Sequence, residues 1–320
     1  MSLISAKTRI LLNLFLPQRR RPNPRYSVSD ADTDLSGKTI VFTGGTDGIG
    51  RVAVEILFKM GADIVLLGRN RAKSEEVIRQ LKSMDDQRTA RLYCCDLASM
   101  ESVNECADRI LADTPHIDVL INNAGINLNR RIITPDGFET NWAVNYLGPY
   151  LLTNRLLKRV RESAPSRIVN LTTNTEFLDE LDCDEISVKT DFDTNSSYVE
   201  SKLSMNMFSI DLALELEGSG ATVNSLCPGY IRSNLLSNLS GPEKIMQAIM
   251  NIMASPAEVG ADRLVRLAIS SEFSGVNGIY LNEDQTRPHH RDAQNFDKRK
   301  RIRKITEKAL SQWLPIQEIE

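Results

Sequence analysis

The feature that most constrains the fold of this chain is a glycine-rich turn between a strand-like and a helix-like stretch. Residues 39–42 (Thr-Ile-Val-Phe) are β-branched or apolar and suit a buried parallel strand. Residues 43–50 (Thr-Gly-Gly-Thr-Asp-Gly-Ile-Gly) hold four glycines and lead directly into the helical pattern of residues 51–60. Glycines let a backbone approach a diphosphate, and a helix N-terminus favours an anion. The order of strand, turn and helix therefore predicts a dinucleotide-binding loop rather than an ordinary tight turn.

The alternation of strand-like and helix-like stretches continues along the chain, and it predicts the fold class. Further strand-like stretches lie at residues 63–67, 91–95, 117–121, 167–171, 221–226 and 276–281. Such alternation is typical of an α/β fold with a doubly wound parallel sheet, here of about seven strands flanked by helices. We expect one domain over residues 35–284. Residues 1–34 would form a basic, amphipathic segment and linker, and residues 285–320 a polar, basic tail with a short helix.

Composition excludes several classes of function. The 320 residues carry a net charge of −3, so no nucleic-acid partner is expected. The five cysteines have no Cys-x-x-Cys spacing, which indicates neither a disulfide framework nor a zinc site, and favours a reducing compartment inside the cell. The three histidines lie outside any catalytic-looking stretch. We therefore expect no bound metal and no Ser-His-Asp chemistry.

Both ends of the chain are basic. Residues 1–29 contain six cations and no acidic residue, with apolar residues at helical spacing. The apolar run at residues 10–16 is shorter than the roughly 20 residues that span a bilayer, so the segment suits an interfacial anchor, a mitochondrial targeting segment or a signal-like region. A helix packed on the protein's own surface or a disordered leader is an equally good interpretation. Six more cations lie within residues 298–304, which suit a solvated helix face or contact with an anionic membrane.

Two strand ends carry candidate cofactor contacts. The second strand ends at Gly68-Arg69, and an arginine at this place suits the 2′-phosphate of NADP, whereas an acidic residue would suit NAD. Asp47 in the glycine turn opposes an extra phosphate. The third strand ends at Asp96-Leu97, where a carboxylate can accept a hydrogen bond from an adenine amino group.

Tyr198 and Lys202 form the candidate catalytic pair. They are four residues apart in a helix-like stretch, so their side chains share one helix face. We expect the lysine to lower the pKa of the phenol and so make Tyr198 a proton donor and acceptor near neutral pH. This spacing alone is common for packing, and it gains weight from the dinucleotide loop upstream.

The glycine turn, the Asn-Asn-Ala-Gly of residues 122–125 and the Tyr-x-x-x-Lys of residues 198–202 together resemble the short-chain dehydrogenase/reductase family. The resemblance covers residues 35–284. Three further stretches are similar to its retinol dehydrogenase-like branch: residues 135–139, residues 144–154 and residues 163–170. The family implies a single Rossmann-type domain, NAD(H) or NADP(H), and hydride transfer between an alcohol and a carbonyl. The branch implies a lipophilic substrate such as a retinoid, and members commonly form homodimers through the helices that bear Asn145 and Tyr198.

The resemblance also implies roles for single residues. Tyr198 would transfer the proton, Lys202 would hold the nicotinamide ribose, and Asn145 would bind a water that links Lys202 to solvent. Thr173 stands where the family usually has the serine that orients the substrate oxygen. Threonine keeps the hydroxyl but adds a methyl group and restricts χ1. This departure supports an alternative in which the chain binds the cofactor with weak or no turnover, as a pseudoenzyme or a membrane-surface scaffold.

The remaining implied cofactor contacts lie in the glycine turn and after the later strands. The turn after the sixth strand would close on the nicotinamide carboxamide. The methionine-rich residues 235–254 would cover an apolar substrate, with ordinary core packing and a membrane-facing surface as the alternatives. The full implied set is Gly44, Thr46, Asp47, Gly48, Ile49, Gly50, Arg69, Asp96, Leu97, Asn123, Tyr198, Lys202, Pro228, Gly229, Ile231 and Ser233. The sequence thus predicts an NADP(H)-preferring oxidoreductase. We expect it to be intracellular, at the endoplasmic reticulum or mitochondrial membrane, or alternatively in the cytosol.

Overall fold

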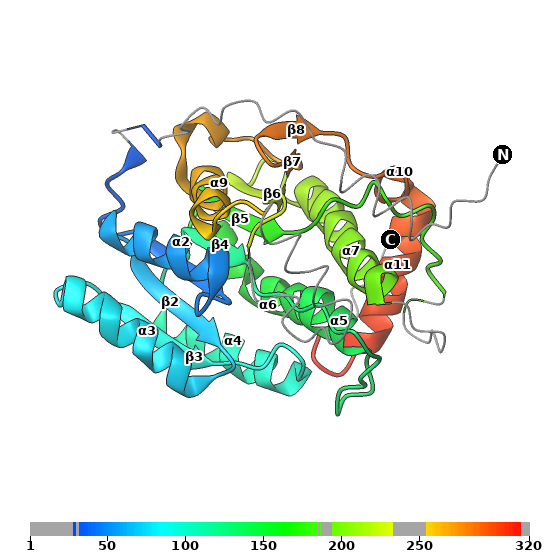
Figure 1. Cartoon of the computed structure of the whole chain (residues 1–320), viewed down its shortest axis with the longest axis horizontal. Helices are drawn as coiled ribbons and strands as arrows, with labels where there is room; N and C mark the ends of the chain where they lie inside the picture. Colours follow the sequence, from blue (N-terminus) through cyan, green and yellow to red (C-terminus); the bar gives the residue numbers. More distant parts are fainter. Residues whose placement is uncertain (1–27, 30–31, 185, 187–193, 233–253, 315–320) are drawn as a thin grey trace.

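The computed structural model of this chain describes residues 28–29, 32–184, 186, 194–232 and 254–314 (Figure 1). The expected N-terminal helix, Ser233 and the methionine-rich residues 235–253 lie outside the described residues. No helix in the described part of the chain has the length and hydrophobicity that a membrane span requires.

One sheet runs through the molecule, with the strand order β3-β2-β1-β4-β5-β6-β7-β8. Its strands are β1 (Thr39–Thr43), β2 (Asp63–Gly68), β3 (Ala90–Cys94), β4 (Val119–Asn122), β5 (Ser166–Leu171), β6 (Ala221–Cys227), β7 (Tyr280–Asn282) and β8 (Gln285–Arg287). The strands β1 to β7 are parallel, and β1 pairs with both β2 and β4. The strand order changes direction between β1 and β4. Ligands of doubly wound sheets bind at such a point, outside the carboxyl ends of the strands. The predicted fold class is confirmed.

The sheet has eight strands, one more than expected, because the chain turns back after β7. β8 pairs with β7 in the antiparallel direction across a two-residue turn. Such turns require a positive φ, and Glu283 adopts a φ of 58°. Glutamate rarely takes this conformation, so the local sequence holds no signal for the hairpin.

Helices cover both faces of the sheet (Figure 1). One apolar cluster lies under α2 (Gly48–Lys59), α3 (Arg71–Met84) and α9 (Ala257–Ile269). The other lies under α4 (Met100–Asp113), α6 (Gly148–Glu162) and α7 (Thr194–Glu215). The short elements are α5 (Thr140–Trp142), the π-helical turn η2 (Ala143–Leu147), the 3₁₀ turn η4 (Ser271–Phe273) and α10 (Arg291–Gln294).

Three helices that follow strands begin at short polar caps. The side chain of Asp47 accepts a hydrogen bond from Gly48 N at the start of α2. Asn70 caps α3 and Ser99 caps α4 in the same way. Such caps satisfy N–H groups that a helix leaves without partners. They place three helix N-termini at the carboxyl ends of the strands, on the side where the ligand is expected.

The C-terminal helix α11 (Phe296–Leu310) packs against the core instead of being solvated all round (Figure 1). Ile302, Thr306 and Leu310 are buried at its inner face, while Lys300 and Lys304 are exposed at its outer face. The basic run of residues 298–304 is therefore part of an amphipathic helix.

Candidate active site

The glycine turn after β1 has room only for glycine at two of its positions. A Cβ at Gly44 would lie 2.7 Å from the Cα of Ala124, and Gly44 has a φ of 74°. A Cβ at Gly50 would lie 2.2 Å from the carbonyl oxygen of Gly44. The turn therefore folds tightly on itself and on the segment after β4. Side chains are kept away from the N-terminus of α2, so a diphosphate can approach the backbone there.

Asn123 fixes the shape of this turn. Its Nδ2 donates to the carbonyl oxygens of Thr43, at 3.0 Å, and of Gly44, at 2.8 Å. In return, Thr43 Oγ1 accepts from the backbone N of Asn123 and of Ala124, both at 3.1 Å. The side-chain amide of Asn123, expected among the cofactor contacts, thus supports the glycine turn. Thr43, which the sequence did not single out, completes the support.

Arg69 lies at the end of β2, beside the glycine turn. A Cβ placed on Gly68 would lie 3.6 Å from Thr46 Cγ2, so the strand end and the turn are neighbours. Arg69 and Asp47 are both exposed. A cation and an anion thus stand at the rim where the adenosine ribose of a dinucleotide is expected.

Asp96 and Leu97 follow β3, as predicted. The Oδ1 of Asp96 accepts from the backbone N of Ala98 at 3.0 Å, which orients the carboxylate. Leu97 is buried, and its carbonyl oxygen would lie 2.7 Å from a Cβ on Gly148. The start of α6 therefore holds this loop close to the sheet.

Arg263 of α9 organises the turn after β6, and sequence reasoning missed it. Its Nη1 donates to the carbonyl oxygen of Pro228 at 2.7 Å, and its Nη2 pairs with Asp284 at 2.8 Å and Glu283 at 3.0 Å. Gly229, the residue after Pro228, has a φ of 81°. The arginine thereby ties the predicted Pro-Gly turn to the hairpin between β7 and β8. A lone arginine in a helix carries no sequence signal for this role.

Two isoleucines join the glycine turn to the loop after β6. A Cβ at Gly260 of α9 would lie 2.8 Å from Ile49 Cδ1 and 3.1 Å from Ile231 Cγ1. Both side chains therefore meet the same point of α9. Ile49 and Ile231, predicted from different ends of the domain, lie on one side of the site.

The four predicted catalytic residues converge. Lys202 Nζ donates to the carbonyl oxygen of Leu171 at 2.9 Å, at the end of β5. A Cβ on Gly125 would lie 3.2 Å from Lys202 Nζ and 3.3 Å from Asn145 Oδ1, so these two groups border the same small space. Two residues past Leu171, the side chain of Thr173 lies beside that of Tyr198, close enough to affect the pKa of the phenol.

Asn145 lies in the π-helical turn η2, where the helix that becomes α6 has one wider turn. Its Oδ1 accepts from Ile126 N at 2.8 Å, and its Nδ2 donates to Ile126 O at 2.9 Å and Ser201 Oγ at 3.0 Å. Single π-turns inside helices occur frequently at functional sites. Here the wider turn directs the amide toward the loop after β4 and toward α7.

The expectation that Lys202 lowers the pKa of Tyr198 is wrong for this structure. Burial raises the pKa of Tyr198 above its ordinary value, nearby Cys227 raises it further, and only the neighbouring Thr173 side chain lowers it. Burial also lowers the pKa of Lys202 to about 8. Desolvation disfavours the charged form of both groups, and Lys202 is not among the groups that shift the pKa of Tyr198.

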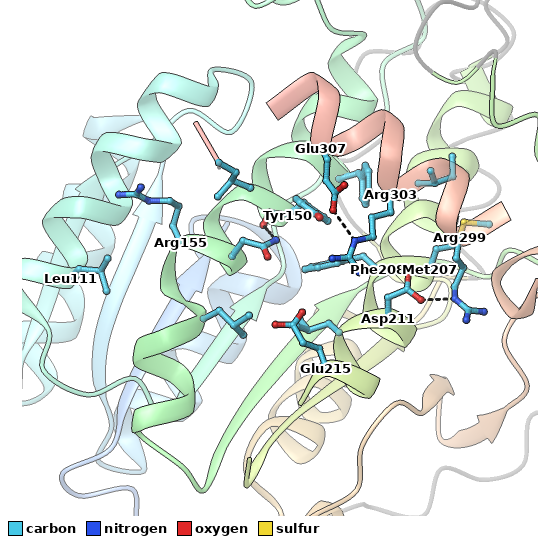
Figure 2. Close-up of a pocket in the computed structure, with 16 residues that line it drawn as sticks. Leu111, Tyr150, Arg155, Met207, Phe208, Asp211, Glu215, Arg299, Arg303 and Glu307 are labelled. Carbon is cyan, nitrogen blue, oxygen red and sulfur yellow. Dashed lines mark hydrogen bonds and ion pairs between the residues drawn. The ribbon is translucent and has the colours of Figure 1, made fainter. Parts of the chain in front are cut away.

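A cavity of about 430 Å³ lies elsewhere, between α6, α7 and α11 (Figure 2). Its lining is aromatic and apolar toward the core, with charged groups along α7 and α11, and it includes Tyr146, Tyr150, Phe208, Asp211, Arg299 and Arg303. Figure 2 shows ion pairs from Arg299 to Asp211 and from Arg303 to Glu307 at its edge. None of the residues predicted for catalysis or cofactor binding lines this cavity.

Comparison with known proteins identifies the family. The model of the short chain dehydrogenase family matches residues 38–244. Retinol dehydrogenase 13 from Homo sapiens is 33% identical over 254 residues, which cover 78% of this chain and 77% of that protein. Polyprenol dehydrogenase from Homo sapiens is 30% identical over 261 residues, 79% of each chain.

A solved structure shows the same fold. A short chain dehydrogenase from Burkholderia cenocepacia, in complex with NADP, superposes with a TM-score of 0.62 and 23% identity over 78% of this chain and 97% of that chain. The chain is thus an oxidoreductase that uses a nicotinamide cofactor and acts on alcohols. It belongs to the short-chain dehydrogenase/reductase family, in the retinol dehydrogenase-like branch.

Proposed function

We propose that the chain is an NADP(H)-preferring enzyme that interconverts a lipophilic alcohol and the corresponding carbonyl, with Tyr198 as the general acid and base. One observation carries the proposal. Tyr198 and Lys202 of α7, Thr173 after β5 and Asn145 of η2 come from three separate segments and meet beside the end of β5. Such a group can bind an oxygen atom and move a proton to or from it.

The glycine turn and the residues around it fit the cofactor. Gly44 and Gly50 leave the N-terminus of α2 open to a diphosphate, and the loop of Asp96 would take the adenine. Lys202 would hold the nicotinamide ribose. When bound, the cofactor supplies or accepts the hydride.

The protein's own residues would handle the oxygen and its proton. The hydroxyl groups of Tyr198 and Thr173 lie beside each other, so both would donate to the same substrate oxygen. A phenol is protonated at neutral pH, and burial raises the pKa of Tyr198 further, so this residue would serve as a proton donor. This state favours reduction of a carbonyl. Lys202, with a pKa of about 8, can lose and regain a proton near neutral pH and so return one to Tyr198.

Arg69 supports the preference for NADP(H). Its exposed guanidinium follows β2 at the place where the 2′-substituent of the adenosine ribose is read. A guanidinium binds phosphate with paired N–H groups, whereas it offers a ribose hydroxyl no comparable match. Fluorescence titration of the protein with NADPH and NADH is the measurement, and tighter binding of NADH would reverse this part of the proposal.

Two named relatives support a lipophilic substrate. One is called a retinol dehydrogenase and the other a polyprenol dehydrogenase, so related proteins of this branch act on isoprenoid alcohols. The methionine-rich residues 235–253, expected to cover the substrate, lie outside the described residues. We propose an apolar alcohol or aldehyde as the substrate class.

The decisive experiment compares the unmodified chain with Tyr198→Phe and Tyr150→Phe on a panel of retinoid, polyprenyl and short apolar aldehydes with NADPH. Tyr150 is a buried phenol on α6 at the remote cavity, so its variant controls for loss of a hydroxyl. We expect Tyr198→Phe to lose at least about 10²-fold in turnover, in line with the weight of a general acid, and Tyr150→Phe to keep its turnover. Full turnover by Tyr198→Phe would remove the proposed mechanism.

Thr173 keeps a second candidate function open, that of a cofactor-binding protein with weak or no turnover. By the family resemblance, Thr173 takes the place of the serine that orients the substrate oxygen, and its additional methyl group would narrow that place. If no compound in the panel is reduced while NADPH still raises the melting temperature, this second function holds. A Thr173→Ser variant that then gains turnover would identify the methyl group as the cause.

We also propose contact with a membrane surface and a homodimer. The basic residues 1–29 would lie on an anionic membrane, of the endoplasmic reticulum or mitochondrion, and liposome flotation with and without them is the test.

For the dimer, α11 occupies part of the α6–α7 face through the Tyr146–Thr306 and Arg299–Asp211 contacts. A partner subunit would therefore have to use the rest of that face or another surface, and light scattering measures the state.

A further inference from the structure

Two asparagines four residues apart make equivalent connections beside the catalytic residues. Asn145 joins Ile126 in the loop after β4 to Ser201 of α7. Asn141 joins the same loop to the same helix one turn earlier. Its Oδ1 accepts from Leu128 N at 3.0 Å, and its Nδ2 donates to Ser197 Oγ at 3.3 Å.

The two serines that receive these bonds are also one helical turn apart, and each immediately precedes a catalytic residue. Ser201 precedes Lys202, and Ser197 precedes Tyr198. The two connections therefore form parallel links between the helix of η2 and α7. The link from Asn141 to Ser197 stands next to the proton-transferring phenol, and the link from Asn145 to Ser201 stands next to the lysine.

The link at Ser197 contains a buried carboxylate. Ser197 Oγ donates to Glu139 Oε2 at 3.0 Å. The same carboxylate accepts from the backbone N of Asn141, at 3.0 Å, and of Trp142, at 2.9 Å, and Glu139 is only 7% exposed. Hydrogen bonds to a carboxylate are shorter and stronger than those between neutral groups, and they gain strength where water is excluded.

Capping of α5 explains only part of this arrangement. A cap requires bonds from backbone N–H groups of its own helix, and Asn141 N and Trp142 N supply them. The bond from Ser197 crosses to a helix 58 residues further along the chain. It reaches the first turn of α7, where N–H groups have no partner within the helix and backbone hydrogen bonds hold the chain least.

We propose that Glu139, Asn141 and Ser197 are positioning residues for the reaction. They fix the first turn of α7 and thereby hold the hydroxyl of Tyr198 beside Thr173. This inference rests on the proposed function, because it assigns the three residues to the orientation of the same general acid. They touch neither the substrate nor the cofactor.

The test uses the full chain with Ser197→Ala, Ser197→Thr and Ser204→Ala. Ser204 is the matched control, because it is a buried serine of α7 whose hydroxyl donates to Glu200 O within the helix at 2.9 Å. We expect Ser197→Ala to lower kcat about tenfold with unchanged KM for NADPH, since a displaced general acid slows the chemical step while cofactor binding continues. Ser197→Thr retains the hydroxyl and should recover most of the lost kcat. Ser204→Ala should behave like the unmodified chain.

If Ser197→Ala has the same kcat as the unmodified chain, the inference is overturned while the proposed function stands. An equal loss in Ser204→Ala also overturns it, because the effect is then general to the helix. If the unmodified chain has no turnover on any compound, the proposed function fails by itself, and amide hydrogen exchange of residues 196–203 decides the inference. Faster exchange in Ser197→Ala alone supports the link, and equal exchange in all three variants removes it.

Discussion

Lys202 shows how burial sets the charge state of a single residue. Its side chain is 4% exposed, and its Nζ donates to the carbonyl oxygen of Leu171. Its pKa is lowered from 10.5 to about 8 because burial penalises the ammonium. Between these two pH values the unfolded chain binds more protons at this site than the folded chain, so this group makes stability rise with pH from about 8 to 10.5.

The first prediction follows from the cost of burying the Lys202 ammonium. Replacing Lys202 with methionine removes a buried ammonium, so Lys202→Met should raise the free energy of unfolding at pH 7 by about 2 kcal/mol, after the lost bond to Leu171 is counted. The gain should shrink toward pH 10, where the folded lysine is already neutral. Denaturant unfolding of both proteins at pH 7 and at pH 10 measures the stability gain at each pH. Equal or lower stability of the variant at pH 7 contradicts the prediction.

At the scale of the element, the glycine turn and the first turn of α2 have opposing requirements at position 50. Helix propensity favours alanine over glycine by about 1 kcal/mol. A Cβ there would however lie 2.2 Å from the Gly44 carbonyl oxygen and 2.4 Å from Asn123 Nδ2. Neither neighbour can move freely, because Asn123 is bonded to the backbone of the turn.

The second prediction is that Gly50→Ala destabilises the protein and abolishes NADPH binding, because the turn must open to admit the methyl group. We expect a loss of about 2 kcal/mol or more in the free energy of unfolding, typical of overpacking. Thermal unfolding with and without NADPH is the measurement. Lys59→Ala, at an exposed position of the same helix, is the control, and a Gly50→Ala variant that is more stable would show that propensity prevails.

At the scale of the whole molecule, Arg299 joins the C-terminal helix to the core. Its side chain is 8% exposed and pairs with Asp211 of α7 at 2.6 Å (Figure 2). Its Nη1 also donates to the carbonyl oxygens of Ala293 and Gln294, both at 3.0 Å. Arg301, two residues on, pairs with Asp184 in an exposed position, where both side chains are more than half exposed.

The third prediction contrasts these two arginines. Arg299→Leu leaves Asp211 and two carbonyl groups without their partner, so it should cost about 3 kcal/mol of unfolding free energy. Arg301→Leu breaks a solvated pair and should cost less than about 1 kcal/mol. Denaturant unfolding of both variants is the measurement. Similar losses in the two would mean that α11 is not anchored by the buried pair.

Local sequence patterns predicted much of the fold. Strands β1 to β6 lie within two residues of the stretches predicted from apolar runs. The hairpin of β7 and β8 was not readable, because Glu283 takes a positive φ without a turn residue to announce it. Arg263 was missed for a similar reason, since its three partners lie 20 to 35 residues away.

The sequence by itself determined the order of strands and helices and the place of the glycine turn, which follow from local periodicity and from residue types that suit only certain backbone conformations. The residues that meet at the site were expected from motifs that resemble the family's, beyond the Tyr198–Lys202 spacing that a helix face explains. The tertiary structure alone decided how the site is charged and held. Burial raises the pKa of Tyr198 where the nearby lysine was expected to lower it, and Glu139 reaches Ser197 across 58 residues. Desolvation and long-range contact depend on packing, which no local pattern contains.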